Sequence, residues 1–96
     1  MPKTRPRRWD AASYLRDEQE IVAYLQAALE EGDASVITAA LGDVARAKGM
    51  SRIARKAGLG RESLYKALSP EGNPEFATVL RVLDALGVRL KAVAAG

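Results

Sequence analysis

The residues best suited to chemistry lie in one stretch, residues 50–69, which reads MSRIARKAGLGRESLYKALS. This stretch carries five bases and a single acid, Glu62. A solvated helix face usually mixes the two signs of charge, so the excess of bases is typical of a surface that binds a polyanion. Any small helical protein can contain two short helices joined at a glycine, but these outward charges favour binding to nucleic acid.

The apolar residues of the same stretch predict two short helices that would position the bases. Ser51 is a candidate N-cap for the first helix, and Gly58 can adopt the positive φ of a sharp turn after it. The second helix is expected from about Arg61 to Leu68. This layout is a helix–turn–helix, whose second helix enters the major groove of DNA. The inward positions of the pair are Ile53, Ala54, Ala57, Leu64, Ala67 and Leu68.

Length and composition narrow the function further. Ninety-six residues make one domain, and the chain has no cysteine and no histidine. Disulfides, the common zinc sites and catalysis by Ser-His-Asp or Cys-His groups are therefore excluded. We also find no paired carboxylates for acid–base chemistry and no glycine-rich phosphate loop. We expect a protein that is not an enzyme and needs neither metal nor cofactor.

The chain carries no targeting signal that we recognise. No apolar run approaches the roughly 20 residues that a membrane span needs. The N-terminus is basic but lacks the apolar core of a signal peptide. We therefore expect a cytoplasmic protein.

The net charge of +3 conceals three blocks of different sign. Residues 1–9 carry four bases and no acid, and residues 10–33 carry seven acids against one base. Residues 34–69 carry seven bases against two acids. A chain with one acidic and one basic block can serve two partners of opposite charge. We interpret residues 1–9 as a flexible basic arm, either solvated or lying along DNA, and residues 10–96 as a single domain.

Two helices are predicted before the helix–turn–helix. Asp17 and Glu20 have the spacing of a capping box that starts the first helix, and Gly32 ends it. Asp33 starts the second helix, which runs to about Lys48. The expected apolar stripe of the first helix is Ile21, Val22, Leu25, Ala28 and Leu29.

Gly42 lies within the second of these helices, where glycine lowers helix stability. We therefore expect another helix to pack closely against it. A last helix is predicted from about Glu75 to a C-cap at Gly87, after the turn SPEGNP. Its expected inward residues are Phe76, Val79, Leu80, Leu83 and Leu86.

The C-terminal segment Val88–Val93 alternates apolar and polar residues, which predicts a β-strand. A lone strand has no partner within the chain, so it either pairs with its copy in a second subunit or frays. The expected fold is therefore all-α, a compact bundle of about five helices with a central helix–turn–helix and a short C-terminal β-strand. The candidate homodimer contacts are Val88, Leu90 and Val93.

Several motifs, placed in this order, resemble one known family. They are Tyr24-Leu25 followed by EEGD, residues 43–50 (DVARAKGM), residues 61–69 (RESLYKALS), Gly72-Asn73-Pro74 and Leu86-Gly87-Val88. They resemble the addiction-module antidote proteins, which are bacterial and prophage antitoxins with an Xre/Cro-like helix–turn–helix related to the HigA type. The resemblance covers roughly residues 9–93. It implies an antitoxin of a type II toxin–antitoxin module that neutralises a RelE/HigB-like toxin and represses its own operon.

Carried onto this sequence, the resemblance makes residues 61–68 the recognition helix. Arg61 then suits a guanine edge, Glu62 a cytosine amine, and Tyr65 a thymine methyl or a phosphate. Ser51 and Arg52 suit a phosphate. The predicted DNA-binding residues are Ser51, Arg52, Arg55, Lys56, Arg61, Glu62, Ser63, Tyr65 and Lys66.

The acidic block, residues 10–33, is the expected docking surface for the toxin, because a protein that cleaves RNA is expected to be basic. The candidate toxin contacts are Tyr14, Glu18, Tyr24, Leu25, Glu30 and Glu31. Two alternatives remain open at this point. Besides the antitoxin, they are a stand-alone prophage-type repressor without a toxin and a module that only binds another protein.

Overall fold

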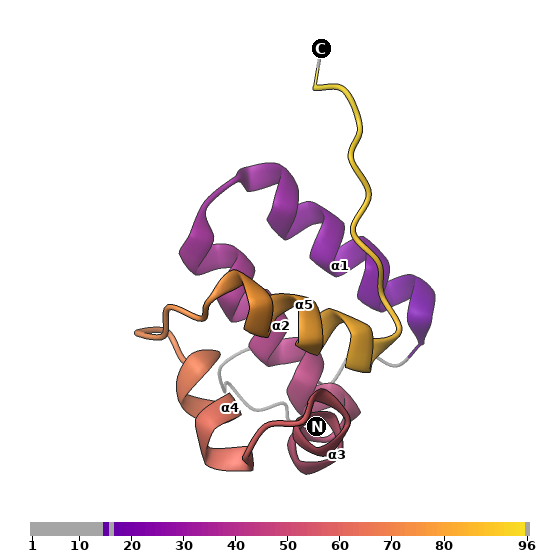
Figure 1. The fold of residues 1–96 in the computed structure, drawn as a ribbon. Coiled ribbons are helices and arrows are strands. Elements are labelled where there is room, and N and C mark those ends of the chain that lie inside the picture. The colour runs from indigo at the N-terminus through magenta and orange to yellow at the C-terminus, as the bar shows by residue number, and fades with distance from the viewer. Residues whose placement is uncertain (1–14, 16, 96) are drawn as a thin grey trace, which may run out of the picture.

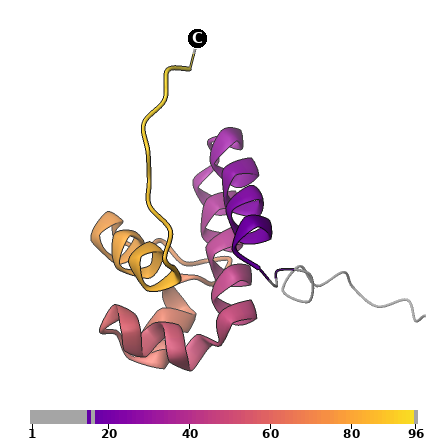
Figure 2. The ribbon, with the colours of Figure 1, turned by 90° about the vertical axis from the view of Figure 1, so that its right-hand side faces the viewer.

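The computed structural model describes residues 15 and 17–95, which form five helices and no β-strand. The predicted basic arm and Tyr14 lie outside these residues. α1 and α2 pack along each other, α5 packs against α2 and α3, and α3 and α4 lie at one end of the molecule (Figures 1 and 2). None of the described helices has the length and apolar character needed to cross a bilayer. The helices are α1 (Glu18–Glu31), α2 (Ala34–Lys48), α3 (Met50–Ala57), α4 (Arg61–Ala67) and α5 (Phe76–Leu86).

The first two helices begin and end where the sequence predicts. The backbone N–H of Glu20 donates to Asp17 Oδ1 at 2.8 Å, and the N–H of Asp17 donates to Glu20 Oε1 at 3.4 Å, which completes the capping box. Gly32 ends α1 in the left-handed region, at φ +73°. Asp33 caps α2 by accepting from the N–H of Ser35 at 2.9 Å. These local signals are confirmed.

The core lies where all five helices meet. Its largest wholly buried side chains come from α1, α2, α4 and α5, and α3 adds Ile53, which is also buried. Burial of one such aliphatic side chain stabilises the fold by about 1.5–3 kcal/mol. A small domain of this kind therefore depends on a handful of residues. The wholly buried ones are Ile21, Leu41, Val44, Leu64 and Val82.

The sequence prediction was wrong about one helix start. α3 begins at Met50, one residue before the predicted cap Ser51. Gly49 occupies the N-cap position and makes no side-chain hydrogen bond, since it has no side chain. The burial of Met50 explains the earlier start, because this side chain packs into the core from the first turn of the helix.

The inward face of α5 also differs from the prediction. Phe76 and Leu80 were expected to be buried, but they are 66% and 44% exposed. Val82 is wholly buried in their place, together with Leu83 and Leu86. Apolar residues occupy more of the surface of this short helix than the core can bury. Packing against α2 and α3 therefore decides which of them are buried. On α1, Val22 and Leu29 were likewise expected on the buried side, but both are exposed.

Residues 88–95 run away from the helices as an extended tail (Figures 1 and 2). The predicted strand at residues 88–93 is not formed in this single chain. The N–H of Val88 donates to the carbonyl of Leu83 at 2.9 Å, which ties the start of the tail to the end of α5. A strand needs a neighbour for its ladder, and one copy supplies none. A strand in this segment stays a prediction about an assembly of two chains.

Gly42 makes the closest approach between α2 and the chain leaving α4. A Cβ built on Gly42 would lie 2.9 Å from the carbonyl oxygen of Leu68. This distance is shorter than van der Waals contact, and the obstructing atom belongs to the backbone. The predicted close packing at Gly42 is therefore confirmed, and its neighbour is the end of α4.

We predict that Gly42→Ala destabilises the domain, although alanine is the better helix former. Overpacking costs about 1–3 kcal/mol, against about 1 kcal/mol regained from helix propensity. The free energy of unfolding, measured by urea denaturation, should fall. Ala39→Gly, an exposed site on the same helix, calibrates the propensity effect alone. A gain in stability for Gly42→Ala would contradict the close contact.

Candidate nucleic-acid interface

A three-residue turn joins α3 to α4 and fixes their crossing. Gly58 has φ +74°, the left-handed conformation that the sequence predicts for it. The N–H of Leu59 donates to the carbonyl of Ala54 at 2.9 Å, and the N–H of Gly58 donates to that of Arg55 at 3.2 Å. These bonds satisfy the last carbonyls of α3 in the manner of a Schellman motif. The chain therefore reverses at once, and α4 packs against α3.

α4 is held in place by its inner side and by both of its ends. With seven residues it is too short to be stable alone. Leu64 anchors its inner side and is wholly buried. Beyond its C-terminal end, the N–H of Gly72 donates to the carbonyl of Ser69 at 2.8 Å. A Cβ on Gly72 would lie 2.2 Å from the carbonyl oxygen of Ala67, so only glycine fits there.

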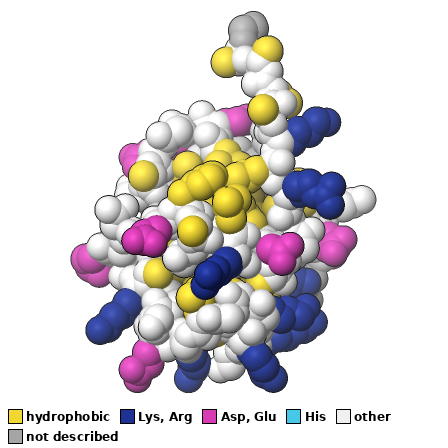
Figure 3. Space-filling view, viewed as in Figure 1, with side chains coloured by type: hydrophobic (Ala, Val, Ile, Leu, Met, Phe, Trp, Pro, Cys, Tyr) yellow, Lys and Arg dark blue, Asp and Glu magenta, His cyan; other side chains and the backbone are white. Residues whose placement is uncertain are grey.

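The nine predicted DNA-binding residues are all exposed. Because α3 and α4 are adjacent, bases that lie apart in the sequence gather at one end of the molecule. Figure 3 shows basic side chains along its lower edge, over these two helices. Glu62 is the only acidic residue in α3 and α4. α3 contributes Ser51, Arg52, Arg55 and Lys56, and α4 contributes Arg61, Glu62, Ser63, Tyr65 and Lys66.

Arg61 and Tyr65 interact on the outer face of α4. The guanidinium carbon of Arg61 lies 5.6 Å from the centre of the Tyr65 ring, a cation–π distance. Such a contact at an exposed site is worth about 0.5–1 kcal/mol. The i, i+4 spacing of the pair in the sequence is the signal that indicates this contact. The contact restrains the arginine at the start of α4.

Two of the three bases of α3 line the same pocket. Arg52 and Lys56 line an open pocket of about 230 Å³ beside Lys48 of α2. Glu18 and Asp84 line the same pocket, so these bases have acids near them. Lys48 was not among the predicted contacts, because it precedes the break at Gly49 and only the packing of α2 and α3 brings it beside Arg52. This flank suits contacts with a phosphate backbone rather than with base edges.

The acidic candidates occupy several positions on α1. Glu30 and Glu31 are exposed at its C-terminal end, on the far side of the molecule from α3 and α4 (Figure 2). Glu18 lies at the other end of α1 and lines the pocket beside Arg52. Leu25 is 4% exposed and belongs to the core, so in this single chain it offers almost no surface to a partner.

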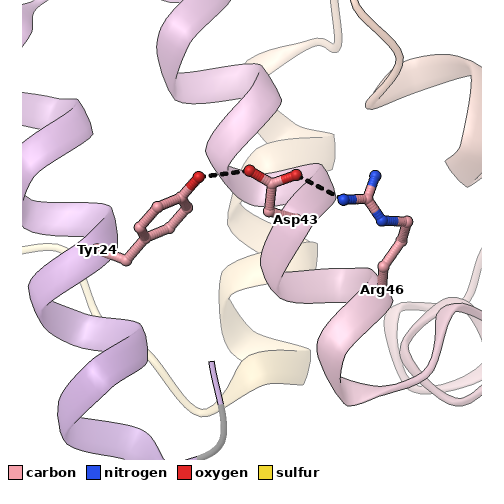
Figure 4. Close-up of polar contacts among 3 residues, drawn as sticks. All are labelled: Tyr24, Asp43 and Arg46. Atoms are coloured by element: carbon pink, nitrogen blue, oxygen red, sulfur yellow. Dashed lines mark hydrogen bonds and ion pairs between the residues drawn. The ribbon is translucent and has the colours of Figure 1, made fainter. Parts of the chain in front are cut away.

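Tyr24 links α1 to α2 within the domain. Its hydroxyl donates to Asp43 Oδ2 at 2.5 Å, and Arg46 Nη2 lies 2.7 Å from Asp43 Oδ1 (Figure 4). Burial, followed by the hydrogen bond to Asp43, raises the pKa of Tyr24 from 10.0 to about 12. The side chain is half-buried and already committed to a polar contact. It therefore serves the packing of α1 on α2, a role that was not predicted from the sequence.

In the part of the chain that the structure describes, these features define a five-helix fold whose α3 and α4, joined by a three-residue turn, present an exposed basic surface. Residues 5–94 match the family described as probable addiction module antidote protein. The chain belongs to this family. A Haemophilus influenzae (strain Rd) protein, described as uncharacterized, is 52% identical over 83 residues, which are 86% of each chain. No solved structure matches the chain significantly.

The raised pKa of Tyr24 predicts how stability depends on pH. The protonated hydroxyl stabilises the fold fully below pH 10, and this contribution is lost as the pH rises through 12. Tyr24→Phe should lower the free energy of unfolding by about 1 kcal/mol at pH 8. The deficit should shrink as the pH rises above 10.

Urea denaturation between pH 8 and 12 measures this difference. Tyr65→Phe is the matched control, because the exposed Tyr65 hydroxyl has no hydrogen-bond partner in the described chain. It should match the unmodified protein throughout. A Tyr24→Phe deficit that stays constant to pH 12 would argue against the link to Asp43.

Proposed function

We propose that the protein is the antitoxin of a type II toxin–antitoxin module and that it also binds its operator DNA as a repressor. Family membership supports the antitoxin role and implies a toxin partner of some kind. The observation that supports DNA binding is the exposed, base-rich face of α3 and α4. The two activities then belong to different parts of one small domain.

The geometry supports α4 as the helix that enters the major groove. Leu64 and Leu68 keep its inner side in the core, and its outer side is free to meet DNA. Arg61 stands in the first turn, where a recognition helix contacts base edges. Arg52 lies on the flank beside Lys48, where a backbone phosphate would neutralise the excess of positive charge.

The acidic end of α1 supports a docking surface for the toxin. Glu30 and Glu31 are exposed and lie away from α3 and α4, so a toxin bound there leaves the basic face open. A RelE/HigB-like toxin is the partner that the sequence resemblance favours, and its expected basic surface matches this end in charge. Charge of this kind mainly speeds encounter and selects the partner.

DNA binding by this face predicts different effects for two arginines. Arg61→Ala should remove about 1–3 kcal/mol of discrimination at one base pair. Arg52→Ala should weaken binding to all sequences alike and reduce the log–log salt slope by about 0.9. Titrations of the native promoter and of scrambled DNA over a salt series distinguish the two effects.

The control for these titrations is Arg81→Ala, which removes an exposed base from α5 and should change neither quantity. Equal losses on both DNAs for Arg61→Ala would exclude this residue as a base reader. Failure of the unmodified protein to prefer its promoter would overturn repression by this face.

We further predict that Glu30→Lys and Glu31→Lys, combined, slow association with the product of the adjacent toxin gene. The rate constant should fall by about tenfold or more at low salt, because opposite charges no longer steer encounter. Stopped-flow mixing measures it, and circular dichroism verifies the fold. Glu71→Lys combined with Glu75→Lys changes the same charge outside α1. An unchanged rate for the α1 variant would place the toxin on another face.

A further inference from the structure

The positive charge of Arg61 is held by an aromatic ring and not by an acid. Its guanidinium carbon lies 5.6 Å from the centre of the Tyr65 ring. Within the described chain, no carboxylate forms an ion pair with Arg61 and no acceptor takes a hydrogen bond from it. The bases that line the pocket on the flank of α3 differ, because Glu18 and Asp84 line that pocket too.

An aromatic ring restrains a cation without using the hydrogen-bond donors of that cation. The attraction acts between the positive charge and the electron-rich face of the ring. A carboxylate in the same place would accept from the N–H groups of the guanidinium and neutralise its charge. Arg61 therefore keeps its planar fork of N–H donors for an acceptor outside the chain.

We propose that Tyr65 acts through Arg61 and not on DNA itself. Its ring positions the guanidinium to read the edge of a guanine, and Tyr65 is thus a positioning residue for base recognition. This inference rests on the proposed binding of operator DNA by α4. Guanine presents N7 and O6 as neighbouring acceptors in the major groove, and the guanidinium fork of an arginine matches them.

The benefit of the contact is that Arg61 is restrained before DNA arrives. A long side chain loses rotamer freedom when it binds, and this cost reduces affinity. Tyr65 is 48% exposed while its neighbour Leu64 is wholly buried, so the ring stands on the outer side of a helix that the core holds in place. An exposed cation–π contact of this kind corresponds to about two- to fivefold in affinity for the base that Arg61 reads.

Single guanines of the native promoter, replaced one at a time by 7-deazaguanine, test the base contact. The replacement removes N7 as an acceptor and leaves base pairing intact. At one position it should weaken binding by the unmodified protein about fivefold or more. Binding by Arg61→Ala should be insensitive to the replacement at that position. If no position behaves in this way, Arg61 does not read a guanine and the proposal is overturned.

Two variants of Tyr65 then distinguish positioning from direct contact with DNA. Tyr65→Leu keeps an apolar side chain but removes the ring, and it should reduce the effect of 7-deazaguanine about two- to fivefold. Tyr65→Phe keeps the ring and should behave as the unmodified protein does. In the Arg61→Ala background, Tyr65→Leu should have no further effect on binding. In the matched Arg52→Ala background, it should have its full effect.

The contact between the two side chains is also measurable without DNA. In the free protein, Tyr65→Leu should shift the NMR signals of the Arg61 side chain, because the ring that lies beside the guanidinium is lost. Tyr65→Phe should leave these signals in place, and circular dichroism verifies the fold of both variants. Arg61 signals that Tyr65→Leu leaves unchanged would show that the ring does not hold the arginine.

Two results on DNA would overturn the positioning role and leave the repressor function standing. If Tyr65→Phe binds as weakly as Tyr65→Leu, the hydroxyl contacts DNA directly. If Tyr65→Leu weakens binding further in the Arg61→Ala background, the ring contacts DNA directly. An unmodified protein with no preference for its promoter would instead overturn the proposed repressor function, and this inference with it.

Discussion

The position of α4 depends on one close approach, where the carbonyl of Leu68 meets α2 at Gly42. A helix of seven residues has too few hydrogen bonds to persist alone, so its stability comes from packing against its neighbours. The missing side chain at Gly42 brings the end of α4 near enough to bury Leu68 together with Leu64. The basic face exists because this contact, with the turn at Gly58, gathers α3 and α4 at one end of the molecule.

The sequence predicted the parts of the fold that local chemistry determines. The cap at Asp17, the cap at Asp33 and the turn at Gly58 each involve atoms a few residues apart, so their patterns are visible in the chain itself. Burial on α5 is different, because it depends on how much of the helix its neighbours cover. Phe76 and Val82 were therefore misjudged, and the strand at residues 88–93 lacks a partner in one chain.

The candidate site was predictable to a similar extent. Exposure of the basic residues on α3 and α4 follows from the positions of apolar residues such as Leu64, and it held for all nine. The bond from Tyr24 to Asp43 was not predictable, because 19 residues separate the two and only the packing of α1 on α2 brings them together. The contribution of Lys48 was missed for a related reason, since its position beside Arg52 spans the break between α2 and α3.

The way α4 is held has a consequence for how such proteins diversify. Its anchors are Leu64, Leu68 and the glycine backbone at Gly72, and none of them lies on the outer surface. Arg61 and Tyr65 contribute almost nothing to the core, so most replacements there should change the free energy of unfolding by no more than about 1 kcal/mol. Single substitutions can therefore change the outer surface without unfolding the domain. The same scaffold can therefore carry different side chains on its outer surface.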